Sequence, residues 1–240
     1  MAFKIVLKGD IPDNAVFVTG FQGIGITGYI AIRHLISSLK AKPLGFILLD
    51  KMPPFVWMEE DRLATPIQIF SYDRYVFLMV EFLPSPPEVY KLITKICEWV
   101  VGTQKFSEAL LIGGLDLRVK KEGEKEDLKF AATTCATKKV LERGYKVLDR
   151  GLFVTGPLAL MLMGFEALDF PALAILAYAN SARPDPMAAA VAIRCFSEMY
   201  GVKVDVEELI KDAQKIEAEV EESLKKRQER LRAESLTLYI

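Results

Sequence analysis

The chain has 240 residues, of which 51% are hydrophobic, so it can bury a sizeable core as one large domain or two small ones. Its 31 basic residues balance 32 acidic ones, and a net charge of −1 provides no overall field that would attract nucleic acid or an anionic membrane. The three cysteines, at positions 97, 135 and 195, form no CxxC pair and indicate reduced thiols in a cytoplasmic protein.

The N-terminal residues and the most apolar tract both argue against a membrane or secretory protein. The first residues lack the basic and apolar regions of a signal peptide. Residues 152–165 form the most apolar tract, but Gly156 and Pro157 interrupt it, and a membrane helix needs roughly 20 apolar residues. We therefore expect a cytoplasmic globular protein that binds neither membranes nor nucleic acid.

Short apolar runs alternate with helical patterns along the chain. Strands are predicted at residues 3–7, 15–19, 44–50, 67–72, 75–82, 109–112, 152–155 and 173–178. Helices are predicted from a glycine-rich loop to residue 40 and at 86–102, 136–143, 158–163, 184–201 and 205–240. The segments 67–72 and 75–82 form a hairpin or an antiparallel edge. This alternation predicts a three-layer α/β fold with a mostly parallel sheet flanked by helices.

The glycine-rich loop has the form of a dinucleotide-binding fingerprint. Gly23, Gly25 and Gly28 match GxGxxG between a strand and a helix, and Asp50 ends the next predicted strand. In the usual fingerprint the first glycine comes almost directly after the strand, whereas here residues 20–22 lengthen the turn. This longer spacing between the strand and the first glycine of the pattern is unfavourable for a pyrophosphate site.

We expect the loop glycines to have structural roles. Gly20, Gly23 and Gly25 permit a tight turn, and Gly28 permits close packing of the helix on the strand. The alternative is that the loop binds a ligand, in which case the chain is a nucleotide-binding or nucleoside-processing α/β enzyme.

No group of residues predicts catalysis. His34 is the only histidine and lies within a predicted helix, so a zinc site lacks ligands. None of the cysteines has an evident partner base, and no GxSxG elbow is present. Residues 118–127 form a charged loop that is most simply a solvated excursion. We therefore expect no catalytic residues, no metal and no cofactor.

The last predicted helix, residues 205–240, is apolar on one side only in its first half. Its apolar residues recur at a helical spacing up to Leu224, where the pattern ends. They are Val206, Leu209, Ile210, Ala213, Ile216, Val220 and Leu224. Basic residues dominate the following turns, and the chain ends in Leu238, Tyr239 and Ile240. We expect an α/β core domain at 1–204, followed by a long helix that carries an exposed apolar tail.

Several of these features together resemble the proteasome assembly chaperone 2 family, over nearly the whole chain. These features are the glycine loop at residues 20–28 and two strand ends at Gly113-Gly114 and Gly156-Pro157. They also include a helix start at residues 184–189 and the entry to the last helix at Val204-Asp205. The resemblance implies a phosphorylase-like α/β fold without known catalysis. Archaeal members imply a homo-oligomer, either a tetramer or a pentamer.

The resemblance also gives the last three residues a role. Proteasome-binding chaperones and activators end in a hydrophobic-tyrosine-X motif, which corresponds here to Leu238, Tyr239 and Ile240. Such tails enter pockets between adjacent subunits of the outer α ring of the core proteasome, where the terminal carboxylate pairs with a lysine.

These observations favour a non-enzymatic chaperone or adaptor that docks on the core proteasome through its tail and assists its assembly or activation. The enzyme alternative depends on the glycine loop. A third alternative is an oligomeric scaffold whose tail serves only its own assembly.

Overall fold

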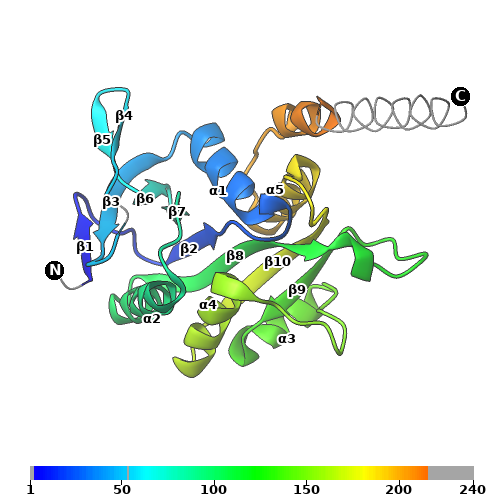
Figure 1. Cartoon of the computed structure of the whole chain (residues 1–240). Helices are drawn as coiled ribbons and strands as arrows, with labels where there is room; N and C mark the ends of the chain where they lie inside the picture. The colour runs from blue at the N-terminus through cyan, green and yellow to red at the C-terminus, as the bar shows by residue number, and fades with distance from the viewer. Residues whose placement is uncertain (1–2, 53, 216–240) are drawn as a thin grey trace, which may run out of the picture.

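The computed structural model describes residues 3–52 and 54–215 (Figure 1). Within these ranges an 8-stranded sheet has the order β1-β3-β6-β7-β2-β8-β10-β9. The strands are β1 (Lys4–Leu7), β2 (Ala15–Gly20), β3 (Lys42–Leu48), β6 (Ile67–Tyr72), β7 (Tyr75–Val80), β8 (Phe106–Asp116), β9 (Leu128–Ala132) and β10 (Ala172–Ala179). A separate two-stranded hairpin contains β4 (Trp57–Glu59) and β5 (Arg62–Ala64).

The centre of the sheet is parallel and both sides are antiparallel. Strands β7, β2, β8 and β10 run in one direction, β9 pairs antiparallel with β10, and β6, β3 and β1 continue antiparallel from β7. Every residue of β2, β7 and β10 is buried. Central strands covered on both faces need apolar residues at all positions, which explains their continuous apolar runs in the sequence.

Two helical layers cover the sheet, as Figure 1 shows. Helices α1 (Thr27–Ser38) and α5 (Pro186–Tyr200) contact each other on one face, and α2 (Pro86–Gly102) and α4 (Gly156–Ala167) contact each other on the opposite face. Side chains of β2 alternate between the two layers: Val16 and Val18 pack under α1 and α5, and Phe17 packs under α2 and α4.

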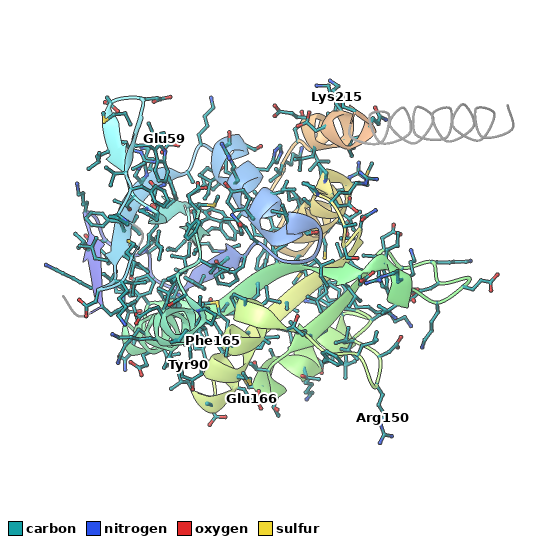
Figure 2. All side chains as sticks on the ribbon, in the orientation of Figure 1. Glu59, Tyr90, Arg150, Phe165, Glu166 and Lys215 are labelled. Atoms are coloured by element: carbon teal, nitrogen blue, oxygen red, sulfur yellow. The ribbon has the colours of Figure 1, made fainter. Side chains whose placement is uncertain are left out.

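Aromatic rings fill the layer between the sheet and the helices α2 and α4. The ring of Phe17 meets Phe106, Trp99 and Phe165 edge-on, at centroid distances of 5.8, 6.4 and 6.4 Å. Figure 2 shows Phe165 in this layer. Edge-to-face pairs of this kind stabilise a core beyond the apolar area that they bury.

The α/β fold class predicted from the sequence is confirmed, and so is the hairpin at residues 67–80, which is β6–β7. One predicted strand is wrong, because residues 152–155 are irregular and precede α4. Strand β9 was missed. Its second residue, Lys129, is buried in an ion pair with Glu124. The charged segment 118–127, which overlaps a short 3-10 helix at Leu117–Val119, is therefore anchored to the sheet rather than fully solvated.

The start of the last predicted helix packs on the core. Residues 207–215 are helical, and Val206 and Leu209 are buried on the side of α1 and α5. Ala213 is buried as well. Nε2 of His34 on α1 donates to the carbonyl oxygen of Asp205 at 2.6 Å, which joins this helix to the body. Lys215 marks the end of the described helix in Figure 2. The remainder of the predicted helix, residues 216–240, lies outside the described residues.

No helix within the described ranges is both long and apolar enough to cross a membrane. Helix α3 (Thr134–Glu142) lies beside β9 and contributes Val140 to the same core as α1 and α5.

Replacing Leu209 tests whether the last described helix contributes to the stability of the core. Leu209→Ala removes a buried side chain, so we expect the free energy of unfolding in urea to fall by about 2 to 3 kcal/mol. Gln214→Ala, on the exposed side of the same helix, serves as the control and should change stability by less than about 0.5 kcal/mol. Equal effects of the two substitutions would show that the helix does not pack as described.

Candidate functional site

The glycine loop joins β2 to α1 at the carboxyl end of the parallel strands, where α/β proteins commonly bind ligands. It begins at Gly20, passes through a short 3-10 helix at Ile24–Ile26 and enters α1 at Thr27. A Cβ added to Gly28 would lie 2.3 Å from the carbonyl oxygen of Ile112 on β8, and one added to Gly20 would lie 2.6 Å from that of Gly28. The first turn of α1 therefore lies directly against the sheet backbone.

Gly25 connects the loop to the chain that follows β10. Its φ of +61° is in the left-handed region, and a Cβ there would lie 2.8 Å from Cβ of Ala179. The amide of Asp185 donates to the carbonyl oxygen of Gly25 at 2.8 Å. The Asp185 carboxylate in turn accepts from the amides of Asn180, at 2.9 Å, and Ala188, at 3.0 Å. Asp185 thus caps α5 and holds two loops together.

The structure does not bring the elements of the dinucleotide fingerprint together. In that fingerprint the acidic residue follows the strand next to the glycine-bearing strand. Here β7 and β6 lie between β2 and β3, so Asp50 at the end of β3 is three strands away from the loop. Gly25 and Gly28 face the protein's own atoms, and among the loop glycines Gly23 has open space around its Cα.

A small apolar pocket of about 80 Å³ lies under the loop. Its walls come from the loop, the ends of β8 and β10 and the chain before α4, and include Phe21, Ile24, Gly114, Phe153 and Leu158. Phe153 at its edge is 77% exposed. None of the described lining residues is ionisable, so the pocket offers no side chain for acid or base chemistry and no base beside the hydroxyl of Thr155.

The other candidate reactive groups are dispersed. His34 is half-buried and bonded to Asp205 and Ser38, away from the pocket. Burial raises the pKa of both Cys97 and Cys195 to about 12, which keeps these thiols protonated at neutral pH, while Cys135 is exposed. Within the described ranges, no group of His, Cys, Asp and Glu residues could hold a metal ion.

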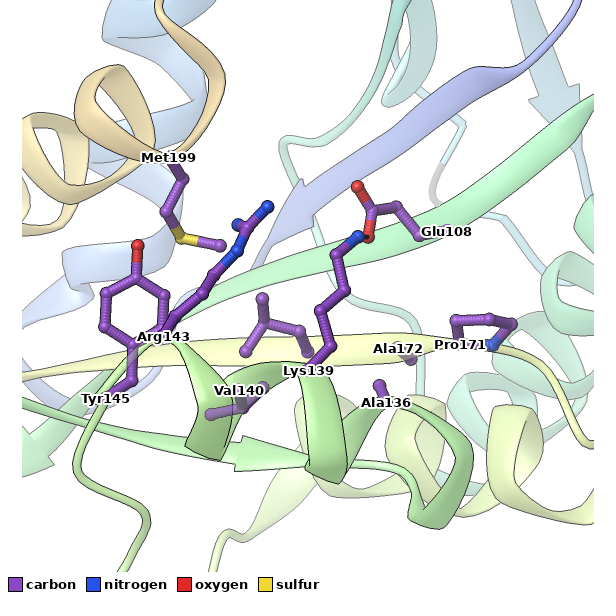
Figure 3. Close-up of a pocket in the computed structure, with 10 residues that line it drawn as sticks. Glu108, Ala136, Lys139, Val140, Arg143, Tyr145, Pro171, Ala172 and Met199 are labelled. Carbon is purple, nitrogen blue, oxygen red and sulfur yellow. Dashed lines mark hydrogen bonds and ion pairs between the residues drawn. The ribbon is translucent and has the colours of Figure 1, made fainter.

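A charged cleft lies between α3 and the end of α5, and the sequence analysis did not single it out (Figure 3). Lys139 on α3 and Arg143 directly after α3 project into it, with Met199 on the opposite wall. Lys139 Nζ forms an ion pair with Glu108 on β8 at 2.9 Å. Burial, together with a hydrogen bond to Glu108, raises the pKa of Tyr200 beside it. The spacing of Lys139 and Arg143, four residues apart on one predicted helix, was the available signal.

The predicted tail residues Leu238, Tyr239 and Ile240 lie outside the described residues. Of the predicted site residues, the structure therefore describes only Gly20, Gly23, Gly25 and Gly28.

Comparisons with known proteins give one family. A family model described as PAC2 family matches residues 17–224. An uncharacterized protein of Methanocaldococcus jannaschii is 26% identical over 225 residues, which are 92% of this chain and 90% of that protein.

Solved structures share the fold. Pyrococcus furiosus PbaA, described as an archaeal homolog of proteasome-assembly chaperone, matches with a TM-score of 0.80 and 23% identity over 91% of this chain and 94% of its own. Pyrococcus furiosus PbaB, described as an archaeal proteasome activator, matches with a TM-score of 0.74 and 17% identity over 92% of this chain and 98% of its own.

A substitution at Gly28 tests the close approach of α1 to the sheet. We expect Gly28→Ala to lower the free energy of unfolding by about 2 kcal/mol or more, because the new Cβ must displace the backbone of β8. The matched control is Gly23→Ala in the same loop, where no atom lies within 4 Å of the added Cβ. Urea denaturation of both variants decides the matter. If Gly28→Ala were as stable as Gly23→Ala, the described contact would be wrong.

Proposed function

The chain belongs to the PAC2 family, and on that premise we propose that it is a non-enzymatic chaperone or adaptor that acts on the proteasome. The single observation that carries the proposal is the family match over residues 17–224. The full-length likeness to PbaA and PbaB supports it, since one is described as a homolog of proteasome-assembly chaperone and the other as a proteasome activator.

The geometry of the glycine loop supports the non-enzymatic part of the proposal. Gly25, the second glycine of the pattern, packs against Ala179 and Asp185, so protein atoms occupy the position where a fingerprint loop would approach a pyrophosphate. We infer that Gly20, Gly25 and Gly28 serve packing. The enzyme alternative lacks both the adjacent acidic residue and an ionisable group in the pocket.

We further propose that Leu238, Tyr239 and Ile240 make the main contact with the α ring of the core proteasome. Leu238 provides an apolar side chain, Tyr239 a rigid ring with a hydroxyl, and the carboxylate after Ile240 a negative charge for a lysine. A pocket that receives the tail leaves its own lysine unpaired when the carboxylate is displaced, and it loses apolar contact when Leu238 or the ring of Tyr239 is removed.

A homo-oligomer fits this mode of binding. Several linked tails on one assembly raise the local concentration of tails at the ring, and overall binding strengthens by roughly 10²-fold or more without new contacts. We propose that the protein acts in this form, with the proteasome and further copies of itself as its partners.

Nucleotide titration separates the chaperone from the enzyme alternative. We expect calorimetric titration with NAD, NADP, ATP and nucleosides to give no saturable binding at micromolar concentrations, because the loop contacts its own protein. Micromolar binding that Gly23→Val weakens would support the enzyme instead. Gly23 is the informative position because a side chain there blocks a ligand without displacing protein atoms.

Variants of the tail test the docking proposal by surface plasmon resonance on immobilised core proteasomes. Tyr239→Ala, deletion of residues 238–240, and addition of five residues after Ile240 should each weaken binding at least about tenfold, or 1.4 kcal/mol. Tyr239→Phe isolates the hydroxyl, and Ser235→Ala outside the motif is the control that should bind like the parent. Light scattering checks that oligomer mass is unchanged. The docking proposal fails if the three motif variants bind as tightly as Ser235→Ala.

A further inference from the structure

The β4–β5 hairpin projects from the sheet as an arm, at the upper left of Figure 1. Its apolar side chains are unusually exposed: 57% for Val56, 65% for Met58 and 60% for Leu63. An isolated two-stranded hairpin is marginally stable in water, so an arm with apolar flanks is typical of a surface that another chain covers.

The base of the arm is ordered by aromatic contacts. Phe55 stacks on Trp57 with a centroid distance of 6.0 Å and meets the ring of Phe82 edge-on at 6.0 Å. Arg62 donates to Gln68 on β6 at 2.6 Å and also pairs with Glu59. These contacts hold the arm in position and leave its end exposed.

The end of the arm is acidic. Residues 59–62 contain Glu59, Glu60 and Asp61 against the single cation Arg62, a net charge of −2, and the three carboxylates are exposed. Figure 2 shows Glu59 on this hairpin. Two such ends repel each other, and charge complementarity favours a basic partner surface for the arm.

A basic groove is present elsewhere on the chain. The charged cleft, whose residues Lys139, Arg143 and Met199 appear in Figure 3, holds about 340 Å³. It continues past the end of α5 into a second hollow of about 470 Å³, and the two hollows share Arg74 and Tyr200. Four cations line them against two carboxylates, a net charge of +2: Arg74, Lys139, Arg143 and Lys203 face Glu108 and Asp73. We call these two hollows the basic groove.

The cations of the groove outnumber its carboxylates. Glu108 pairs with Lys139 and also attracts Arg74, while the guanidinium of Arg143 interacts with the hydroxyl of Tyr145. Arg74 lies over the rings of Tyr75 and Tyr200, at 5.6 and 5.8 Å, which hold its guanidinium in place. Guanidinium groups fixed in this way suit carboxylate recognition.

We propose that the acidic end of the arm of one copy binds in the basic groove of a second copy. In this contact the arm end, with a net charge of −2, meets the groove, with a net charge of +2. Met58 and Leu63 beside the acidic end pack against Met199 and Val202, which line the groove. The two adjoining hollows, of about 340 and 470 Å³, offer room for the end of a hairpin. The inference rests on the proposed homo-oligomer and identifies the surfaces that form it.

Charge reversal tests this contact with two double variants, measured by light scattering at micromolar concentration. The arm variant is Glu60→Lys with Asp61→Lys, and the groove variant is Arg74→Glu with Arg143→Glu; all four side chains are exposed, so folding should be retained. Each variant alone should associate at least about tenfold more weakly than the parent. An equimolar mixture of the two should recover association, because the reversed arm then meets a reversed groove and the parent arm meets the parent groove.

The control reverses two exposed acids elsewhere, Glu122→Lys with Glu208→Lys, and should associate like the parent. If both double variants keep the parent's oligomer mass and affinity, or if the mixture does not recover association, the arm–groove contact is refuted while the homo-oligomer stands. A parent protein that is monomeric at the same concentrations would refute the homo-oligomer together with this contact.

Discussion

The close approach of α1 to the backbone of β2 and β8 is the contact on which the rest of the structure depends. Only glycine fits at Gly20 and Gly28, where a Cβ would meet carbonyl oxygens at 2.6 and 2.3 Å. This contact aligns the loop so that Gly25 accepts the amide of Asp185, and Asp185 in turn caps α5. This single junction therefore positions both α1 and α5, and it also positions the loops at the carboxyl edge of the sheet. A loop used in this way is part of the core.

Much of the fold could be predicted from the sequence because central strands buried on both faces have continuous apolar runs. Strand β9 could not be predicted from the sequence, because Lys129 interrupts its apolar pattern. This lysine is buried through its ion pair with Glu124. Residues 152–155 had the composition of a strand, but Phe153 is exposed and Val154 lines the pocket under the glycine loop. Local pattern does not distinguish a strand from an apolar segment at a pocket edge.

The candidate site shows a second limit of sequence reasoning. The distance between Asp50 and the glycine loop depends on strand order, and the insertion of β6 and β7 between β3 and β2 is a property of the whole sheet. The basic groove likewise joins residues from the β6–β7 turn, α3 and the chain after α5. No local motif marks it. The fold by itself does not determine the function, which rests on the family and on surfaces that partners contact.

Electron cryomicroscopy of core proteasomes incubated with an excess of the full-length chain tests the central claim most directly. The account predicts additional density over the outer α ring at one or both ends of the particle, with connections that enter the pockets between adjacent α subunits. Particles whose ends remain bare at saturating concentrations of correctly folded protein would contradict it.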